Sequence, residues 1–459
     1  MTIHPRIAYS GLLGLILLTT GVWSVAAPTH KELVTIQKTV DPRELRATIT
    51  QLVGFGTRHT LSDTTSTTRG IGAARRWVQG RFETLSQACH RCLIIATPSM
   101  EVEGSRIPNR AHIENVIAIQ PGSTDPKRVV VISAHLDSRV SDPMNSTDDA
   151  PGANDDASGV AAVMEAARVL SHDRFAATIV YAVLSGEEQG LFGGKLLAQY
   201  AREQEWQVEA VLNNDIVGNT HGQSGVIENQ VVRVFSEGTK AVETPAEGEQ
   251  RRYSGGEVDS PSRSLARYMS TVATEYLKPF SAHMVYRTDR YSRGGDQVPM
   301  LAAGYPAVRV TEATENYTRQ HQDVRTEHGV HYGDVIDGVD FDYLAQVTRL
   351  DVLTLASLAH APAPPANVTL EGAVSADTTL HWSADPAASL YRVWWRDTTA
   401  PTWQYSREAG KDTQITLNHV VIDDWFFGVQ ALSSDGYMSP IVYPGAAGSF
   451  SSPPATFPQ

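Results

Sequence analysis

Residues 133–170 read SAHLDSRVSDPMNSTDDAPGANDDASGVAAVMEAARVL and directly follow the apolar run RVVVI. The apolar run is typical of a buried strand, and residues 159–170 have the apolar spacing of a helix. Acidic residues at a helix start are ordinary, because they suit the positive end of the helix dipole. That does not explain His135 two residues before Asp137. The stretch therefore predicts a strand, a loop with reactive side chains, and a helix.

The same alternation of short apolar runs and helical patterns continues from about residue 40 to residue 360. Together with the run already described, at 128–133, buried strands are predicted at 115–120, 177–185, 208–215 and 306–312, and a second helix at 191–204. Strands that alternate with helices indicate an α/β fold, with a mostly parallel sheet covered by helices on both faces. We expect residues 27–360 to form this domain.

The N-terminal residues have the layout of a secretory signal peptide. One Arg precedes an apolar run from about Ile7 to Val25, and small residues follow it. The alternative is a single membrane anchor, but the run is only marginally long enough to span a bilayer. The small residues favour cleavage near Ala26. Residues 1–26 are therefore predicted to be a signal peptide, and the mature protein to be secreted or periplasmic, without a stable membrane span.

Composition limits the partners. The formal net charge of the 459 residues is −13, which argues against nucleic acid as a partner because nucleic acid requires clustered Lys and Arg.

The only cysteines are Cys89 and Cys92. In an exported protein they suit a local disulfide. A thioredoxin-like redox pair is the alternative, but no βαβ pattern surrounds them.

The chain changes character after residue 360. Residues 360–368 are rich in Pro and Ala, as in an interdomain linker. Five of the eight tryptophans follow, among short strand patterns separated by turns. Residues 361–459 are thus predicted to be a linker and a small all-β sandwich. The last strand and its SSDGYMSP tail resemble a fibronectin type III module; a carbohydrate- or surface-binding role and a spacer role both stay open.

Imidazole and carboxylate side chains follow several of the predicted strands. Loops at the carboxyl ends of parallel strands meet above the sheet, where α/β proteins place their sites. Singly, each residue has an ordinary explanation, such as helix capping by Asp155 or Asp156. The candidates are His135, Asp137, Asp155, Glu187, Glu188, Asp215 and His321.

Considered together, these residues predict a metal centre. Carboxylates held close together repel one another unless cations lie among them. Three carboxylates and one hydroxide would balance two zinc ions. Imidazole and carboxylate are both zinc ligands, and two ions can activate one water molecule. Asp155 is placed to bridge them, and Asp137 to accept the other ring proton of His135. Of the adjacent Glu187 and Glu188, one would bind metal and the other act as general base.

The joint pattern HLDS, GANDDASG, SGEEQGL, NND and QHQD resembles the M28 family of co-catalytic dizinc peptidases, whose best-known members are secreted bacterial aminopeptidases. The resemblance covers roughly residues 40–355. It implies two zinc ions, held by His135 and Asp215, by Glu188 and His321, and by the bridging Asp155. It further implies Glu187 as the general base and Asp137 as the partner of His135.

One position departs from the family pattern. The family usually has an aromatic or apolar residue before the last His, whereas Gln320 precedes His321 here. His328 and His331 are neighbours that compete for the role, but they lie beyond the motif. The segment 286–310 resembles a family loop near the substrate pocket, and its Arg and Tyr residues are candidate substrate contacts; a solvated loop is the alternative.

The resemblance implies an exported zinc exopeptidase. We expect an aminopeptidase that cleaves N-terminal peptide bonds of a peptide or protein with a free N-terminus, through a water bridged by two zinc ions. The alternatives are glutaminyl cyclisation, which related folds perform with one zinc, and carboxypeptidase activity. A non-catalytic binding relative is a further class; it would be marked by a lost ligand or by loss of Glu187, and none of these is missing.

Overall fold

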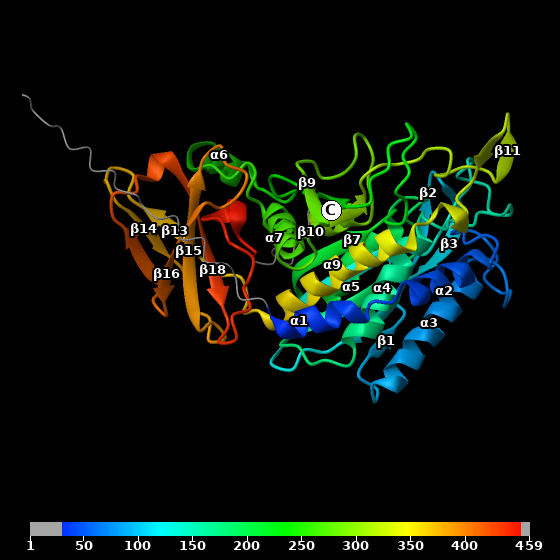
Figure 1. The fold of residues 1–459 in the computed structure, drawn as a ribbon, viewed down its shortest axis with the longest axis horizontal. Coiled ribbons are helices and arrows are strands. Elements are labelled where there is room, and N and C mark those ends of the chain that lie inside the picture. The colour runs from blue at the N-terminus through cyan, green and yellow to red at the C-terminus, as the bar shows by residue number, and fades with distance from the viewer. Residues whose placement is uncertain (1–29, 451–459) are drawn as a thin grey trace, which may run out of the picture.

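The computed structural model describes residues 30–450, which form a large α/β part and a smaller β-sandwich (Figure 1). The eight-stranded sheet of the α/β part has the order β1-β4-β6-β5-β7-β10-β8-β9. Its strands are β1 (Ile94–Ala96), β4 (Val116–Gln120), β5 (Asp125–His135), β6 (Ala177–Leu184), β7 (Gln207–Asn214), β8 (Val231–Phe235), β9 (Ser281–Val285) and β10 (Ala307–Glu312).

The central strands are parallel, and the edges are mixed. β6, β5, β7 and β10 run parallel to one another, whereas β4 is antiparallel to β6 and β8 to β10. The predicted fold class is therefore confirmed, with a strand at each predicted position. The sheet is mostly rather than wholly parallel because β4, β8 and β9 run opposite to the central strands.

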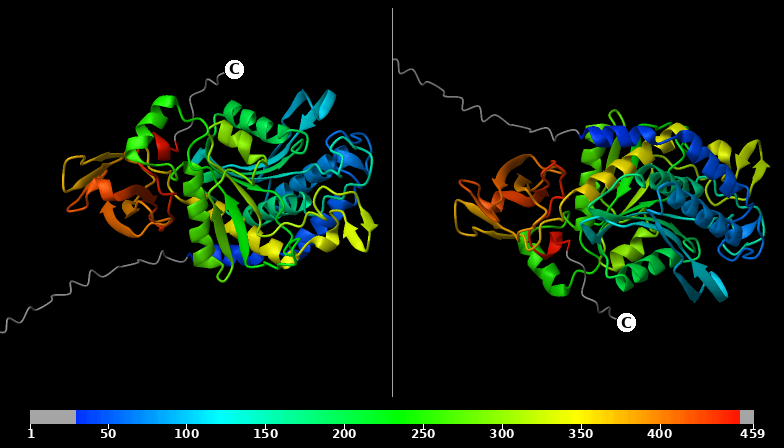
Figure 2. Two further views of the ribbon diagram at one scale, coloured as in Figure 1. Left: turned by 90° about the horizontal axis from the view of Figure 1, so that it is seen from above. Right: turned by 90° about the horizontal axis from the view of Figure 1, so that it is seen from below.

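Helices cover both faces of the sheet (Figure 2). The helices are α1 (Lys31–Ile36), α2 (Pro42–Val53), α3 (Gly70–Ala88), α4 (Ala157–Leu170), α5 (Phe192–Glu203), α6 (Pro245–Ser254), α7 (Pro261–Tyr276), α8 (Gln297–Ala302) and α9 (Phe341–His360). Short 3₁₀ helices lie at Gln37–Thr39, Ile336–Gly338, Ile422–Asp424 and Ala446–Gly448.

β5 shows why the predicted strands have continuous apolar runs. Val130 and Ile132 pack on the face covered by α4 and α9, whereas Val129 and Val131 pack on the face covered by α5 and α8. Successive side chains of a strand point to opposite faces, so a strand buried on both faces requires apolar residues at every position. The strand thereby brings His135, its last residue, to the carboxyl edge of the sheet.

Two hairpins extend from the sheet. One consists of β2 (Ser99–Gly104) and β3 (Ile107–Glu114), and the other of β11 (Arg325–Glu327) and β12 (Val330–Tyr332). Figure 1 labels β2, β3 and β11 on its right.

Cys89 and Cys92 form a disulfide directly after α3. The prediction of a local disulfide is thus confirmed.

The predicted signal peptide, residues 1–26, lies outside the described residues. Within residues 30–450, no helix combines the length and the apolar character that a membrane crossing requires.

The C-terminal strands form two antiparallel sheets of three strands each, as the sequence predicts for a small sandwich. The sheets have the orders β13-β14-β17 and β16-β15-β18. The fibronectin type III resemblance stays a prediction. The strands are β13 (Thr369–Glu371), β14 (Thr378–His381), β15 (Leu390–Asp397), β16 (Tyr405–Gly410), β17 (Gln414–Leu417) and β18 (Trp425–Leu432).

The sandwich is docked on the α/β part. Arg396 of β15 donates to both carboxylate oxygens of Asp259, at 2.8 and 2.9 Å, and Arg267 of α7 also donates to Asp259. Ala361 is buried, and its carbonyl oxygen accepts a hydrogen bond from Arg128. The start of the segment predicted to be a linker therefore packs against the large domain.

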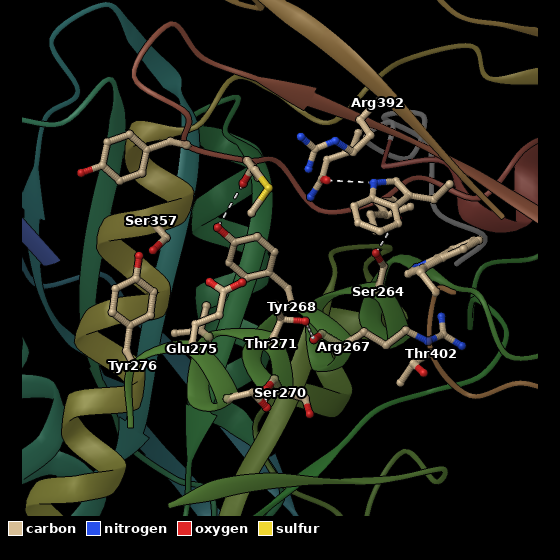
Figure 3. Close-up of a pocket in the computed structure, with 18 of the residues that line it drawn as sticks. Ser264, Arg267, Tyr268, Ser270, Thr271, Glu275, Tyr276, Ser357, Arg392 and Thr402 are labelled. Carbon is tan, nitrogen blue, oxygen red and sulfur yellow. Dashed lines mark hydrogen bonds between the residues drawn. The ribbon is translucent and has the colours of Figure 1, made fainter. Parts of the chain in front are cut away.

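A cavity of about 360 Å³ lies between α7 and the sandwich. Figure 3 shows Tyr268 and Arg267 of α7 and Arg392 of β15 among its lining residues. Tyr268 donates to the carbonyl oxygen of Met438, and Trp394 donates to Gln430 across the same region. The hydrogen bond of Tyr268 joins the two parts of the chain, whereas that of Trp394 lies within the sandwich.

Arg396→Ala is expected to lower the free energy of unfolding by about 3 kcal/mol, because removal of one partner leaves a buried charge poorly compensated. Asp259 keeps Arg267, so the lower end of the usual range applies. Chemical denaturation measures the change. Arg407→Ala, at an exposed position of β16, is the control and should change stability little. Equal stability of both variants would contradict a structural role for the Arg396 pair.

Candidate metal centre

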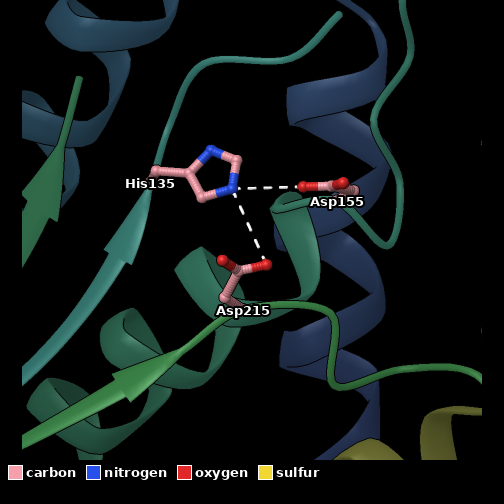
Figure 4. A group of neighbouring side chains, drawn as sticks. All are labelled: His135, Asp155 and Asp215. Atoms are coloured by element: carbon pink, nitrogen blue, oxygen red, sulfur yellow. Dashed lines mark ion pairs between the residues drawn. The ribbon is translucent and has the colours of Figure 1, made fainter. Parts of the chain in front are cut away.

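One group of three candidate ligands lies at the carboxyl edge of the sheet (Figure 4). His135 ends β5, Asp215 follows β7, and Asp155 precedes α4. His135 Nε2 lies 3.1 Å from Asp155 Oδ1 and 3.9 Å from Asp215 Oδ1. One imidazole and two carboxylates thus converge on one point.

A second group shares Asp155 with the first. His321 Nε2 lies 3.0 Å from Asp155 Oδ2 and 3.0 Å from Glu188 Oε1. Each oxygen of Asp155 therefore faces a different histidine. The structure brings all five predicted ligands together and divides them as the sequence predicts, while their binding of metal stays a prediction.

The donors of both groups are largely buried. His135, Asp155, Glu188 and Asp215 are at most 6% exposed, and the side chain of His321 is 29% exposed. Burial alone would lower the pKa of His321, but Glu188 and Asp155 outweigh it and raise that pKa to about 10. Burial alone would raise the pKa of Asp155, but the two histidines hold it well below its usual range.

These pKa shifts have one physical cause, the close contact of imidazoles with carboxylates in a buried space. The carboxylates require positive charge nearby, and protonated imidazoles supply it in the absence of a cation. Two imidazoles and three carboxylates are also a donor set suited to zinc, with donor atoms within 4.8 Å of one another in each group. The residues present therefore fit two zinc ions.

Two further carboxylates position the shared ligand. Asp334 Oδ2 accepts hydrogen bonds from the backbone N–H of Asp155 at 2.7 Å and of Asn154 at 3.0 Å. Asp156 caps α4 by accepting from Gly159, and it also accepts from the N–H of His135. Of the two proposed capping residues, Asp156 caps the helix, and Asp155 is left to face the histidines. The peptide bond that joins them is cis.

Asp137 differs from its predicted role. His135 Nδ1 lies 2.9 Å from the backbone carbonyl oxygen of Asp137 but 3.7 Å from its carboxylate. The carboxylate instead accepts from the backbone N–H groups of Gly186, Glu187 and Glu188. A fully buried carboxylate requires several donors, and this turn supplies them. Asp137 thus orients the His135 ring through its main chain and holds the Glu187–Glu188 turn through its side chain.

Asp137→Asn is expected to reduce kcat by about 10–100-fold, the usual cost of changing a group that orients ligands. The amide nitrogen would meet backbone N–H groups that now donate to Asp137. Steady-state kinetics and zinc analysis measure the effect. Asp142→Asn, at an exposed position of the loop after β5, serves as control. Unchanged kinetics would show that the turn keeps its position without this carboxylate.

Arg309 of β10 was missed by the sequence interpretation. It is fully buried and pairs with Asp215 Oδ2, which leaves Asp215 Oδ1 directed toward His135. A usable signal was present, because Arg309 stands inside a run predicted to be a buried strand, and a buried charge requires a partner. For Asp334, the sequence contains no comparable indication of a role in the site.

The two competing histidines lie elsewhere. His328 and His331 belong to the exposed β11–β12 hairpin, and the side chain of His328 is 92% exposed. Neither of them belongs to a group that could hold a metal within residues 30–450.

A cavity of about 390 Å³ opens over both groups. Glu187 lines it and is partly exposed, whereas its neighbour Glu188 is buried between the histidine and the turn. Burial, together with Glu188 and Asp215, raises the pKa of Glu187 well above its usual value against the opposing effect of His135. The two adjacent glutamates therefore have different environments.

The model of peptidase family M28 matches residues 115–333, which contain all seven candidate residues. A probable zinc metalloprotease of Leptosphaeria maculans is 42% identical over 92% of this chain and 99% of its own length. The chain belongs to peptidase family M28. A second relative, a probable zinc metalloprotease of Pyricularia oryzae, is 44% identical over 88% of this chain and 82% of its own length.

Solved structures share the fold of this chain. LapB from Legionella pneumophila has a TM-score of 0.53 at 19% identity and covers 74% of this chain and 78% of its own. The LapA aminopeptidase of the same organism has a TM-score of 0.51 at 19% identity; the match covers 73% of this chain and 76% of LapA. The family resemblance is thus confirmed, although the curated relatives named here are fungal rather than bacterial.

Proposed function

We propose that this M28 protein is an exported dizinc exopeptidase that removes N-terminal residues from peptides. The observation that carries the proposal is the position of Asp155, whose two carboxylate oxygens face two different histidines beneath an open cavity. Relatives that cover nearly the whole chain are named probable zinc metalloproteases, and the LapA neighbour is titled an aminopeptidase.

The five donors divide between two ions. His135, Asp155 and Asp215 would hold one, and Asp155, Glu188 and His321 would hold the other. Zinc bound there supplies Lewis acidity, which polarises a peptide carbonyl and lowers the pKa of a water molecule.

Glu187 moves the proton. It lines the cavity beside both groups without belonging to either, so its carboxylate is free to accept a proton from the attacking water. It then returns that proton to the leaving amine, as one general base and acid. Asp137 keeps Glu187 in place through the backbone N–H groups of the turn.

The alternatives are less well supported by the site. A cyclase with one zinc would require only one complete group of donors, whereas two are present here. A non-catalytic relative would not retain both the five donors and Glu187. Carboxypeptidase activity uses the same groups, so the substrate screen below includes it.

The test combines metal analysis with a substrate screen. We expect about two zinc ions per chain, hydrolysis of aminoacyl p-nitroanilides, and no cleavage of the same compounds after N-acetylation. At most one tightly bound ion after zinc supplementation would count against the dizinc site. Cleavage of N-acetylated peptides at the C-terminal residue would replace the aminopeptidase assignment with a carboxypeptidase.

The proposal of export rests on the N-terminal sequence, in which an apolar run is followed by small residues. We expect mature protein from the culture medium or periplasm to begin near Ala27, after cleavage by signal peptidase. N-terminal sequencing of the native protein measures this. Soluble cytoplasmic protein that still carries Met1 would refute export.

A further inference from the structure

Four arginines line the cavity that opens over the two groups of candidate ligands. Arg106 belongs to the β2–β3 turn and Arg139 to the loop after β5, whereas Arg290 and Arg293 precede α8. Three separate segments of the chain therefore contribute positive charge to one cavity of about 390 Å³.

The carboxylates near the loop before α8 do not balance these charges. Glu315 is shared by Arg233 at 2.8 Å, Arg293 at 2.9 Å and Arg290 at 3.6 Å. Asp289 pairs with Arg290 at 3.1 Å and lies 3.7 Å from Arg309. The ligand carboxylates would be balanced by two zinc ions under the proposed function, so they do not require the arginines. Glu187 adds one more carboxylate to the lining, and an excess of positive charge remains at the cavity.

Among the four arginines of the cavity, Arg290 has an N–H group that donates no hydrogen bond within the described residues. Its side chain is only 8% exposed, and its Nε donates toward Asp289. Its Nη1 has no hydrogen-bond partner among residues 30–450 and lies 3.6 Å from the nearest oxygen of Glu315. A buried N–H group without a partner is unfavourable. A guanidinium is also suited to binding a carboxylate through two parallel hydrogen bonds.

Arg139 is held rigidly beside the second group. Its Nε and Nη2 donate to the carbonyl oxygens of Val140 and Ser141, and its Nη1 lies 3.9 Å from Glu188 Oε2. Ser141 and Asp323 exchange two hydrogen bonds, which tie this loop to the loop of His321. The charge is thus already in place before a substrate enters, which reduces the cost of binding.

We propose that this cavity binds a substrate carboxylate next to the scissile bond, with Arg290 as the principal contact and Arg139 as a second positive charge. The inference rests on the proposed peptidase function and specifies its substrate class. Two kinds of peptide present a carboxylate there: one with Asp or Glu at its N-terminus, and one whose C-terminal residue is released with its free carboxylate.

The experiment compares substrates that differ only in this charge, using the full-length zinc-loaded enzyme. The first arm uses the p-nitroanilides of Glu and Gln. The second uses a dipeptide, Leu-Gly, and its C-terminal amide. We expect kcat/KM to be about 10-fold or more higher for the acid in one arm, as for a site that recognises a specific polar group. The arm that shows the preference identifies the source of the carboxylate.

Binding supplies a readout that does not depend on hydrolysis. If an acidic side chain is the source, titration calorimetry should show about 10-fold tighter binding of free L-glutamate than of L-glutamine; if a C-terminal carboxylate is the source, it should show the same preference for Leu-Gly over its amide in an inactive Glu187→Gln enzyme. If no substrate is hydrolysed but glutamate binds selectively, the proposed function fails and the carboxylate site stands. If substrates are hydrolysed without preference in either arm and glutamate does not bind more tightly than glutamine, the carboxylate site is overturned.

Variants test whether Arg290 causes the preference for the acid over the amide. Arg290→Gln should reduce the acid-to-amide ratio of kcat/KM about 10-fold, and Arg139→Gln should reduce it by a smaller factor. Arg287→Gln is the matched control, because Arg287 is exposed in the same segment and does not line the cavity; its ratio should stay unchanged. An unchanged ratio in a folded Arg290→Gln would overturn the assignment. If that variant does not fold, the wild-type ratios and Arg139→Gln decide.

Discussion

Glu187→Gln is expected to keep both zinc ions and to lose about 10²–10⁴-fold in kcat. The amide has the shape of the carboxylate but cannot accept a proton from water. Glu187 lies outside both groups of donors, so the metal should stay bound. Because the lost interaction belongs mainly to the transition state, KM should change little. Elemental analysis and single-turnover rates measure both properties.

Glu188, the neighbour of Glu187 in the sequence, provides the most direct comparison. Glu188 Oε1 lies 3.0 Å from His321 within the second group, so Glu188→Gln removes an anionic donor. Zinc content and activity should fall together in this variant, and added zinc should partly restore both. Glu205→Gln, at a position 83% exposed on the surface, is the control for the loss of one charge.

Two outcomes would contradict these assignments. Loss of zinc in Glu187→Gln with retention in Glu188→Gln would mean that the two roles are reversed. If neither substitution changes the rate, the catalytic site lies elsewhere and the proposed function fails.

Asp155→Asn is expected to remove both metal ions and to abolish activity. Asp155 is the one residue that belongs to both groups. Mutation of a group that merely supports a ligand costs about 10–100-fold in metal affinity, so loss of a shared anionic donor should cost more. Zinc should raise the melting temperature of the wild-type protein but not of this variant, because only a bound ion stabilises the fold.

Comparison with Asp215→Asn separates a shared ligand from a single one. Asp215 belongs only to the first group, so its variant should retain about one ion under the same conditions. Asp148→Asn, at an exposed position of the loop that carries Asp155, should retain two. Retention of both ions by Asp155→Asn would exclude Asp155 as the shared ligand.

The sequence by itself determined the strands and the candidate donors. Residues 129–132 have apolar side chains at successive positions, because β5 is buried on both faces. The positions of His135, Asp155 and Asp215 follow from this, since parallel strands end at one edge of the sheet. Local pattern and residue type therefore predicted the candidate donors, whereas the choice of Glu188 over Glu187 as ligand came from the family resemblance.

Only the tertiary structure decided which partners the donors have. Asp334 holds Asp155 across 179 residues, and Arg309 pairs with Asp215 across 94. Asp137 has three backbone donors from the turn after β6 instead of the ring of His135. These contacts depend on the sheet order, which places β5 between β6 and β7, and on the bend of each loop. Local sequence encodes neither, because a hydrogen bond forms with whichever group the packed fold brings within about 3 Å.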